Sequence, residues 1–169
     1  MITLIEDILA LSKLDEGQAP AQKEQVELLS LARDVAAMLA AAADAQKVSI
    51  VVEGVAAIIT GVRSMLEEML FNLIDNSIKY NRLGGKVRVT VSYTNEGATV
   101  TVADSGVGIA PEHQERVFER FYRVDKSHSR STGGTGLGLS IVKHGAMLHG
   151  ANVTLMSKVG EGTDIMITF

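Results

Sequence analysis

Cysteine is absent from this chain of 169 residues, which excludes both a disulfide framework and a metal site built from thiolates. No apolar run approaches the ~18 residues needed to cross a bilayer, and the first residues lack the basic segment and cleavage site of a signal peptide. A formal net charge of -4 provides no general attraction to nucleic acid. We therefore expect a cytoplasmic chain, or a piece of a longer protein, with no nucleic-acid partner and no direct membrane contact.

Hydrophobic residues make up 46% of the chain, which allows a substantial buried core. Over residues 2–14, apolar side chains recur at a spacing typical of a helix with a coiled-coil seam. Because three helical turns are not stable alone in water, we expect the end of a longer helix that packs on this domain or on a partner helix. Residues 15–23, with Gly17 and Pro20, are typical of a hinge or linker.

The rest of the chain mixes helical and strand patterns. Periodicity favours helices at 28–45, 64–80 and 137–149, and Ser64 with Glu67 has the spacing of a capping box. The expected strands are 48–53, 57–60, 86–94, 98–104, 151–157 and 163–169. The glycine-rich stretch 106–136 is expected to hold one or two short helices. These elements predict an α+β fold, a two-layer sandwich whose mixed, mostly antiparallel sheet carries helices on one face.

Two asparagines on the helix expected at 64–80 are candidates for ligand binding. Glu68, Asn72, Asn76 and Tyr80 follow one another in steps of four along one side of that helix. Asn72 and Asn76 therefore lie at the edge of its apolar stripe, where two amides are unfavourable unless they bind something. Mg²⁺ prefers oxygen ligands, so one amide oxygen could complete a site with triphosphate oxygens. Hydrogen bonding to neighbouring backbone is the simpler alternative.

Asp104 is a candidate for base recognition. It shares a strand face with Val100 and Val102, so its carboxylate points toward the core side, where acids are rare unless paired. The exocyclic amine of adenine is a suitable donor, whereas guanine offers an acceptor and should be rejected by roughly 1–3 kcal/mol. Gly106 and Gly108 would let the backbone turn sharply beside a ring. An ordinary Asp-Ser-Gly turn is the alternative.

The stretch GGTGLGLSIV, residues 133–142, places glycines directly before an apolar helix. Free backbone N–H groups near Leu137, at the positive end of that helix, would suit phosphate, with help from Lys79 and Arg123. The glycines form neither a Walker loop nor a G-x-G-x-x-G pattern, which argues against P-loop and dinucleotide sites. A flexible loop before a helix is the alternative.

In this order, and with ERVFERFYRVD at 115–125, the motifs strongly resemble the catalytic ATP-binding domain of bacterial sensor histidine kinases. The resemblance covers roughly residues 26–169 and includes that family's N box, two glycine boxes and F box. The opening LIEDILALSKLDEG resembles the end of the second helix of the family's dimerisation and phosphotransfer bundle. The resemblance implies a helix end at 1–17, a catalytic domain of the Bergerat type at 18–169, and an ATP lid between Gly106 and Gly138.

The resemblance also implies roles for individual residues. Asn76 would bind Mg²⁺, with Asn72 near the phosphates, and Tyr80 would pack beside the base. Asp104 would read adenine, and Lys79 and Arg123 would contact phosphate. The full set expected to bind ATP is Asn72, Asn76, Lys79, Tyr80, Asp104, Gly106, Gly108, Ile109, Gly134, Thr135, Gly136, Leu137 and Gly138. The expected catalytic residues are Asn72, Lys79 and Arg123. Phe118, Phe121 and Tyr122 would anchor the near end of the lid, or simply pack in the core.

The reaction type is indicated by position 72. In related ATPases the similar motif is E-x-x-x-N, in which the glutamate activates water. Here Asn72 stands at the position of that glutamate, and its amide cannot accept a proton. We therefore expect a kinase whose nucleophile comes from elsewhere. None of the four histidines, His113, His128, His144 and His149, matches the family's phosphoacceptor pattern His-Glu-x-x-Thr-Pro.

The implied function is transfer of the γ-phosphoryl of ATP to a histidine on a dimerisation bundle outside this chain, with a response regulator as a further partner. Two alternatives stay open. The chain could be an autonomous ATPase of the same superfamily, or a nucleotide-dependent regulatory binding module.

Overall fold

The computed structural model describes residues 22–124 and 135–169. Its elements, in chain order, are β1 (Glu24–Glu27), α2 (Leu28–Met38), α3 (Ala40–Gln46), β2 (Ser49–Gly54), β3 (Ile58–Gly61), α4 (Arg63–Lys79), β4 (Lys86–Thr94), β5 (Gly97–Asp104), α5 (Pro111–Gln114), the 3₁₀ turn η1 (Arg116–Phe118), α7 (Gly138–His149), β6 (Asn152–Lys158) and β7 (Gly162–Thr168). The helix expected at 2–14 and the boundary after residue 17 lie outside the described residues.

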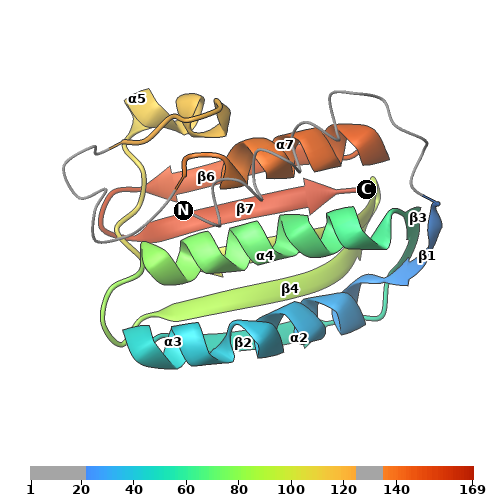
Figure 1. The fold of residues 1–169 in the computed structure, drawn as a ribbon, viewed down its shortest axis with the longest axis horizontal. Helices are drawn as coiled ribbons and strands as arrows, with labels where there is room; N and C mark the ends of the chain where they lie inside the picture. Colours follow the sequence, from blue (N-terminus) through green and yellow to red (C-terminus); the bar gives the residue numbers. More distant parts are fainter. Residues whose placement is uncertain (1–21, 125–134) are drawn as a thin grey trace.

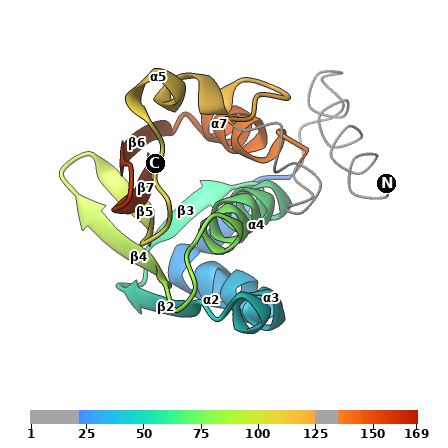
Figure 2. The ribbon, with the colours of Figure 1, turned by 90° about the vertical axis from the view of Figure 1, so that its left-hand side faces the viewer.

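A five-stranded sheet forms one layer of the fold, in the order β2-β4-β5-β7-β6 (Figure 1). β2 pairs with β4 in parallel, and the other neighbours pair antiparallel. Figure 2 shows α2, α3, α4 and α7 together on one side of this sheet. The predicted two-layer α+β sandwich with a mixed, mostly antiparallel sheet is confirmed.

The core lies between α4 and the middle of the sheet. Strand alternation places Val89, Val102 and Ile165 side by side across β4, β5 and β7, and all three are buried. From the helix layer, Leu73 and Ile74 of α4 are buried against them in the same cluster. Removal of this apolar surface from water fixes α4 over the strands, and the polar edge of the helix is thereby placed at the end of β5.

In the first part of the chain, one expected helix is corrected, one expected strand is confirmed and one further strand was not predicted. The helix expected at 28–45 is divided at Leu39, whose ψ of 0° ends α2 before α3 begins. Leu39 and Ala43 are both buried, so packing rather than the alanine-rich sequence sets the direction of α3. The strand expected at 57–60 is β3, and it pairs with β1 in a separate two-stranded sheet. β1 was not predicted, because Val26 is its one buried residue and a single apolar position gives no alternation.

The capping box expected at Ser64 is wrong. α4 begins at Arg63, with Val62 as its N-cap residue, and it has no side-chain cap. A residue from the far end of the chain contributes instead: the Nε2 atom of His149 accepts a hydrogen bond from the Val62 N–H, at 3.0 Å. The Nδ1 atom of His149 lies 2.7 Å from the Gly145 carbonyl oxygen. The end of α7 is thus tied to the start of α4 by a contact that no local pattern reveals.

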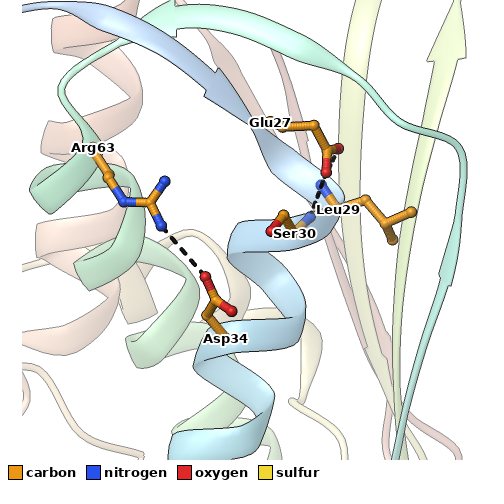
Figure 3. Close-up of polar contacts among 5 residues, drawn as sticks. All are labelled: Glu27, Leu29, Ser30, Asp34 and Arg63. Atoms are coloured by element: carbon orange, nitrogen blue, oxygen red, sulfur yellow. Dashed lines mark hydrogen bonds and ion pairs between the residues drawn. The ribbon is translucent and has the colours of Figure 1, made fainter.

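The start of α2 is capped by Glu27 (Figure 3). Its carboxylate accepts hydrogen bonds from the N–H groups of Leu29 and Ser30, both at 2.8 Å, and of Ala57, at 3.2 Å. Burial by itself would raise the pKa of Glu27, but the three amide donors and the nearby charge of Arg33 outweigh it and lower the pKa. This one carboxylate joins β1, α2 and the segment before β3.

Figure 3 also shows an ion pair between Asp34 of α2 and Arg63 of α4, 3.3 Å apart. Both side chains are exposed, so we assign little stability to this pair. Among the described residues, no helix combines the length and apolar character required to span a membrane.

We expect Glu27→Ala to lower the free energy of unfolding by about 1 kcal/mol, because the α2 terminus loses its cap. Since the pKa of Glu27 is lowered in the folded state, its contribution is present above the ordinary value of 4.5 and is lost as the pH falls through the folded value. Urea unfolding at pH 7 and pH 3 measures both effects. Glu24→Ala, on the same strand, is the matched control, and equal losses in the two variants would contradict the capping role.

Candidate functional site

A cavity of about 640 Å³ lies beside α4, the end of β5 and the start of α7, within the size range of small-molecule sites. Eleven of the fourteen residues expected to bind ATP or to act in catalysis line it: Asn72, Asn76, Lys79, Tyr80, Asp104, Gly108, Ile109, Arg123, Thr135, Gly136 and Gly138. Gly106 lies against its wall, where an added Cβ would stand 2.8 Å from Asp104 Oδ1. Leu137 is the buried N-cap residue of α7, and Gly134 falls outside the described residues.

Asp104 is partly buried at the end of β5, on the strand face that Val100 and Val102 bury. Its Oδ1 atom accepts hydrogen bonds from the N–H groups of Gly106, at 2.8 Å, and Thr163, at 3.3 Å. Burial raises the pKa of the Asp104 carboxyl; these two amides and the Ser77 hydroxyl act in the opposite direction without overcoming it. The site therefore holds an acid whose charged form is disfavoured by its surroundings.

The two asparagines meet the first residue of α7. Asn72 Nδ2 donates to the Glu68 carbonyl at 2.9 Å. The alternative interpretation, hydrogen bonding to neighbouring backbone, therefore holds for the nitrogen of Asn72. A Cβ on Gly138 would stand 2.6 Å from Asn72 Oδ1 and 3.4 Å from Asn76 Nδ2. Glycine at 138 thus lets α7 begin directly against both amides, and both amides line the cavity.

Lys79 and Arg123 place positive charge on the cavity wall. Lys79 Nζ lies 2.6 Å from Asp75 Oδ2, one helical turn away, and its side chain is 37% exposed. The N–H of Leu137, expected to be free for phosphate, donates to Thr135 Oγ1 at 3.3 Å. Phosphate binding there would have to replace this weak local bond.

The aromatic residues after η1 differ in their surroundings. Tyr122 lines the cavity; its hydroxyl lies 2.7 Å from His113 Nδ1, and the guanidinium carbon of Arg116 lies 4.2 Å from its ring centre. Phe121 is 61% exposed, with a φ of 64°. Tyr122 thus takes part in the wall of the site, whereas the ring of Phe121 is not part of the core.

Sequence reasoning missed Ser77 and Thr163, which both bond Asp104. Ser77 follows Asn76 directly and is buried, so its place in the motif was a usable signal. Thr163 faces Asp104 only through the register of β5 with β7, and no local pattern predicts such a pairing. Among the described residues, no cluster of three or more His, Asp or Glu side chains could hold a metal.

Residues 61–169 match the family model described as "Histidine kinase-, DNA gyrase B-, and HSP90-like ATPase". The chain belongs to this family. It is 35% identical over 166 residues, 98% of its length, to the sensor-like histidine kinase SenX3 of Mycolicibacterium smegmatis. It is 34% identical over 170 residues, all of its length, to the phosphate regulon sensor protein PhoR of Pseudomonas aeruginosa. The chain spans 43% and 38% of these two relatives, less than half of each.

Solved structures agree with the fold. The mycobacterial sensor histidine kinase MprB is 27% identical, with a TM-score of 0.73 over 86% of this chain and 95% of that chain. Full-length ShkA is 26% identical, with a TM-score of 0.82 over 98% of this chain and 34% of that chain. The resemblance to the ATP-binding domains of sensor histidine kinases, made from four motifs, is confirmed.

We expect Asp104→Asn to stabilise the folded chain at neutral pH. Asparagine keeps an acceptor for the Gly106 and Thr163 amides but removes the partly buried charge. Because the pKa of Asp104 is raised, the stability cost of its charge is absent below the ordinary value of 3.8 and grows as the pH rises through the folded value. Melting temperatures from pH 4 to 8 measure this. Asp34→Asn, in an exposed ion pair, should change little, and a lower melting temperature for Asp104→Asn at pH 7 would show that its hydrogen bonds outweigh burial.

Proposed function

We propose that the chain is the ATP-binding catalytic domain of a sensor histidine kinase. It would transfer the γ-phosphoryl of ATP to a histidine on a dimerisation bundle that these residues do not include. The observation that supports this most is that one cavity collects two helix amides, two cations and a partly buried carboxylate. Of the two named relatives, SenX3 is a sensor-like histidine kinase and PhoR is a phosphate regulon sensor protein. The ShkA structure is a complex with AMPPNP.

Adenine would lie at the Asp104 end of the cavity. The carboxylate can accept a hydrogen bond from the exocyclic amine of adenine, whereas guanine presents a carbonyl that repels it. Tyr80, half exposed on the cavity wall, would cover one face of the ring. Glycine at 106 keeps this end open, because a Cβ there would stand 2.4 Å from the Tyr80 carbonyl oxygen and press on the Asp104 carboxylate.

The part of the cavity lined by Asn72 and Asn76 would suit a magnesium triphosphate. Asn72 Oδ1 and the Asn76 amide are oxygen donors of the kind Mg²⁺ takes, and phosphate oxygens and water would complete its shell. We assign Asn76 as the protein ligand. When bound, Mg²⁺ neutralises charge on the phosphates. Lys79 and Arg123 would hold phosphate oxygens, with Asp75 orienting Lys79.

The residues of this chain would act by position and charge. Phosphoryl transfer is catalysed mainly by alignment and by neutralisation of the transferred group. The amide at 72 accepts no proton from water, so hydrolysis should be slow and the acceptor histidine must come from the bundle. We further propose that residues 1–17 are the end of that bundle's second helix, and that a response regulator receives the phosphoryl group.

The chain should bind a non-hydrolysable ATP analogue in the presence of Mg²⁺, as measured by calorimetry. Asn76→Ala should weaken this binding by about tenfold or more, because the ion loses its protein ligand. In EDTA the variant and the parent chain should bind equally weakly. Asn95→Ala, at the exposed β4–β5 turn, is the matched control. Unchanged Mg²⁺-dependent affinity in Asn76→Ala would rule out the metal assignment.

A longer version of the protein that carries the bundle tests the kinase activity. With labelled ATP it should form acid-labile phosphohistidine, and Asn76→Ala should abolish that label. No phosphohistidine despite intact ATP binding would favour a regulatory binding module. Steady phosphate release by the chain alone, lost in Asn72→Ala, would favour an autonomous ATPase.

A further inference from the structure

Arg82, just after the end of α4, bonds two loops that are far apart in the sequence. Its Nε atom donates to the Ser105 carbonyl at 2.5 Å. Its Nη2 atom donates to the carbonyls of Gly106, at 3.2 Å, and Gly160, at 2.6 Å. The α4–β4 connection, the loop after β5 and the β6–β7 turn meet here, at one end of the sheet, on the left in Figure 1.

The loop after β5 is held from a second side by Asn81. Asn81 Oδ1 accepts hydrogen bonds from the Arg82 N–H, at 3.0 Å, and from the Ser105 hydroxyl, at 3.3 Å. The Ser105 hydroxyl oxygen accepts from the Lys86 N–H at 2.9 Å. Each peptide from 105 to 107 has a partner, since the Val107 N–H donates to the Tyr80 carbonyl at 3.1 Å. This loop is therefore fixed by side chains and not only by its own turn.

The groups that Arg82 binds adjoin the two amide donors to Asp104. The Gly106 residue whose carbonyl accepts from Arg82 also donates its N–H to Asp104 Oδ1. The second amide donor, Thr163, follows the same β6–β7 turn: it lies two residues after Glu161, and Glu161 follows Gly160, whose carbonyl accepts from Arg82. A shift of either loop would lengthen a hydrogen bond to the carboxylate, and so change where its oxygen atoms point.

We propose that Arg82 is a positioning residue that sets the base selectivity of the nucleotide site through the turn at Asp104–Gly106. The inference rests on the proposed function. The described residues that line the cavity do not include Arg82, so it acts through the loop and not by touching the nucleotide. Its three acceptors are backbone carbonyls of two loops, which a planar guanidinium with five donors can serve at once.

Lysine at position 82 separates this role from a simple effect of charge. A lysine keeps the positive charge that would attract a triphosphate, but its ammonium is a compact donor that cannot reproduce the guanidinium's fork. If geometry is what matters, Arg82→Lys should resemble Arg82→Ala. If charge is what matters, Arg82→Lys should resemble the parent chain.

The experiment compares the affinities for non-hydrolysable ATP and GTP analogues, with Mg²⁺ at fixed ionic strength, in four chains. These are the parent, Arg82→Ala, Arg82→Lys and the control Arg88→Ala, which removes an arginine 65% exposed on β4 that pairs with Glu53. We expect the parent and the control to prefer the adenine analogue alike. Both Arg82 variants should lose about tenfold of that preference, mainly by binding the adenine analogue more weakly.

Three results would overturn the proposal: full preference in Arg82→Lys, full preference in Arg82→Ala, or equal weakening toward both nucleotides. Equal weakening together with a lower melting temperature would mean that Arg82 only supports the fold. If Arg82→Ala fails to fold, Arg82→Lys and Arg82→Gln carry the same comparison. If the parent chain binds neither nucleotide, the proposed function fails. If the parent prefers the adenine analogue and the Arg82 variants keep that preference, only the role of Arg82 fails.

Discussion

The packing of α4 on the sheet is the interaction on which the site depends. Its apolar stripe is buried against the valines of β4 and β5, and turning the helix about its axis would expose Leu73 and Ile74 to water. This fixed rotation sets where Asn72 and Asn76 lie, because they occupy the edge of the same stripe. The same helix, in one orientation, therefore contributes both to the core and to the site.

Asp104 shows the opposite relation between site and stability. Its carboxylate lies where valines would pack, it is only partly compensated by two amides and a hydroxyl, and its pKa is raised by burial. We expect a neutral residue to suit the fold better at this position. An acid kept in such surroundings fits a site whose selectivity needs an acceptor, and such local departures from the best packing are expected at functional positions. The carboxylate is held by the loop after β5, through Gly106, and by the start of β7, through Thr163.

The sequence predicts well what repeats locally. The strands at 86–94 and 98–104 and the helix at 137–149 have regular periods, and their observed bounds differ by a residue or so. The site was predictable where motif residues lie on one element, as Asn72 and Asn76 do. What failed depends on partners distant in the chain. β1 exists because β3 pairs with it, α4 starts beside His149, Thr163 meets Asp104 through strand register, and Arg82 binds loops 23 and 78 residues away. A single sequence carries no local signal for any of these contacts.

The described residues at the proposed phosphate end limit the chemistry that the domain could support. The nitrogen of Asn72 already donates to the Glu68 carbonyl, and its oxygen is an amide acceptor that cannot take a proton from water. Asp75, a carboxylate of α4 that also lines the cavity, is paired with Lys79. Lys79 and Arg123 attract phosphate but accept no proton. Under the proposed function, these residues would hold and align a nucleotide without activating water, so the nucleophile would come from another domain. This restraint suits a signalling kinase, because ATP consumed without an acceptor would carry no signal.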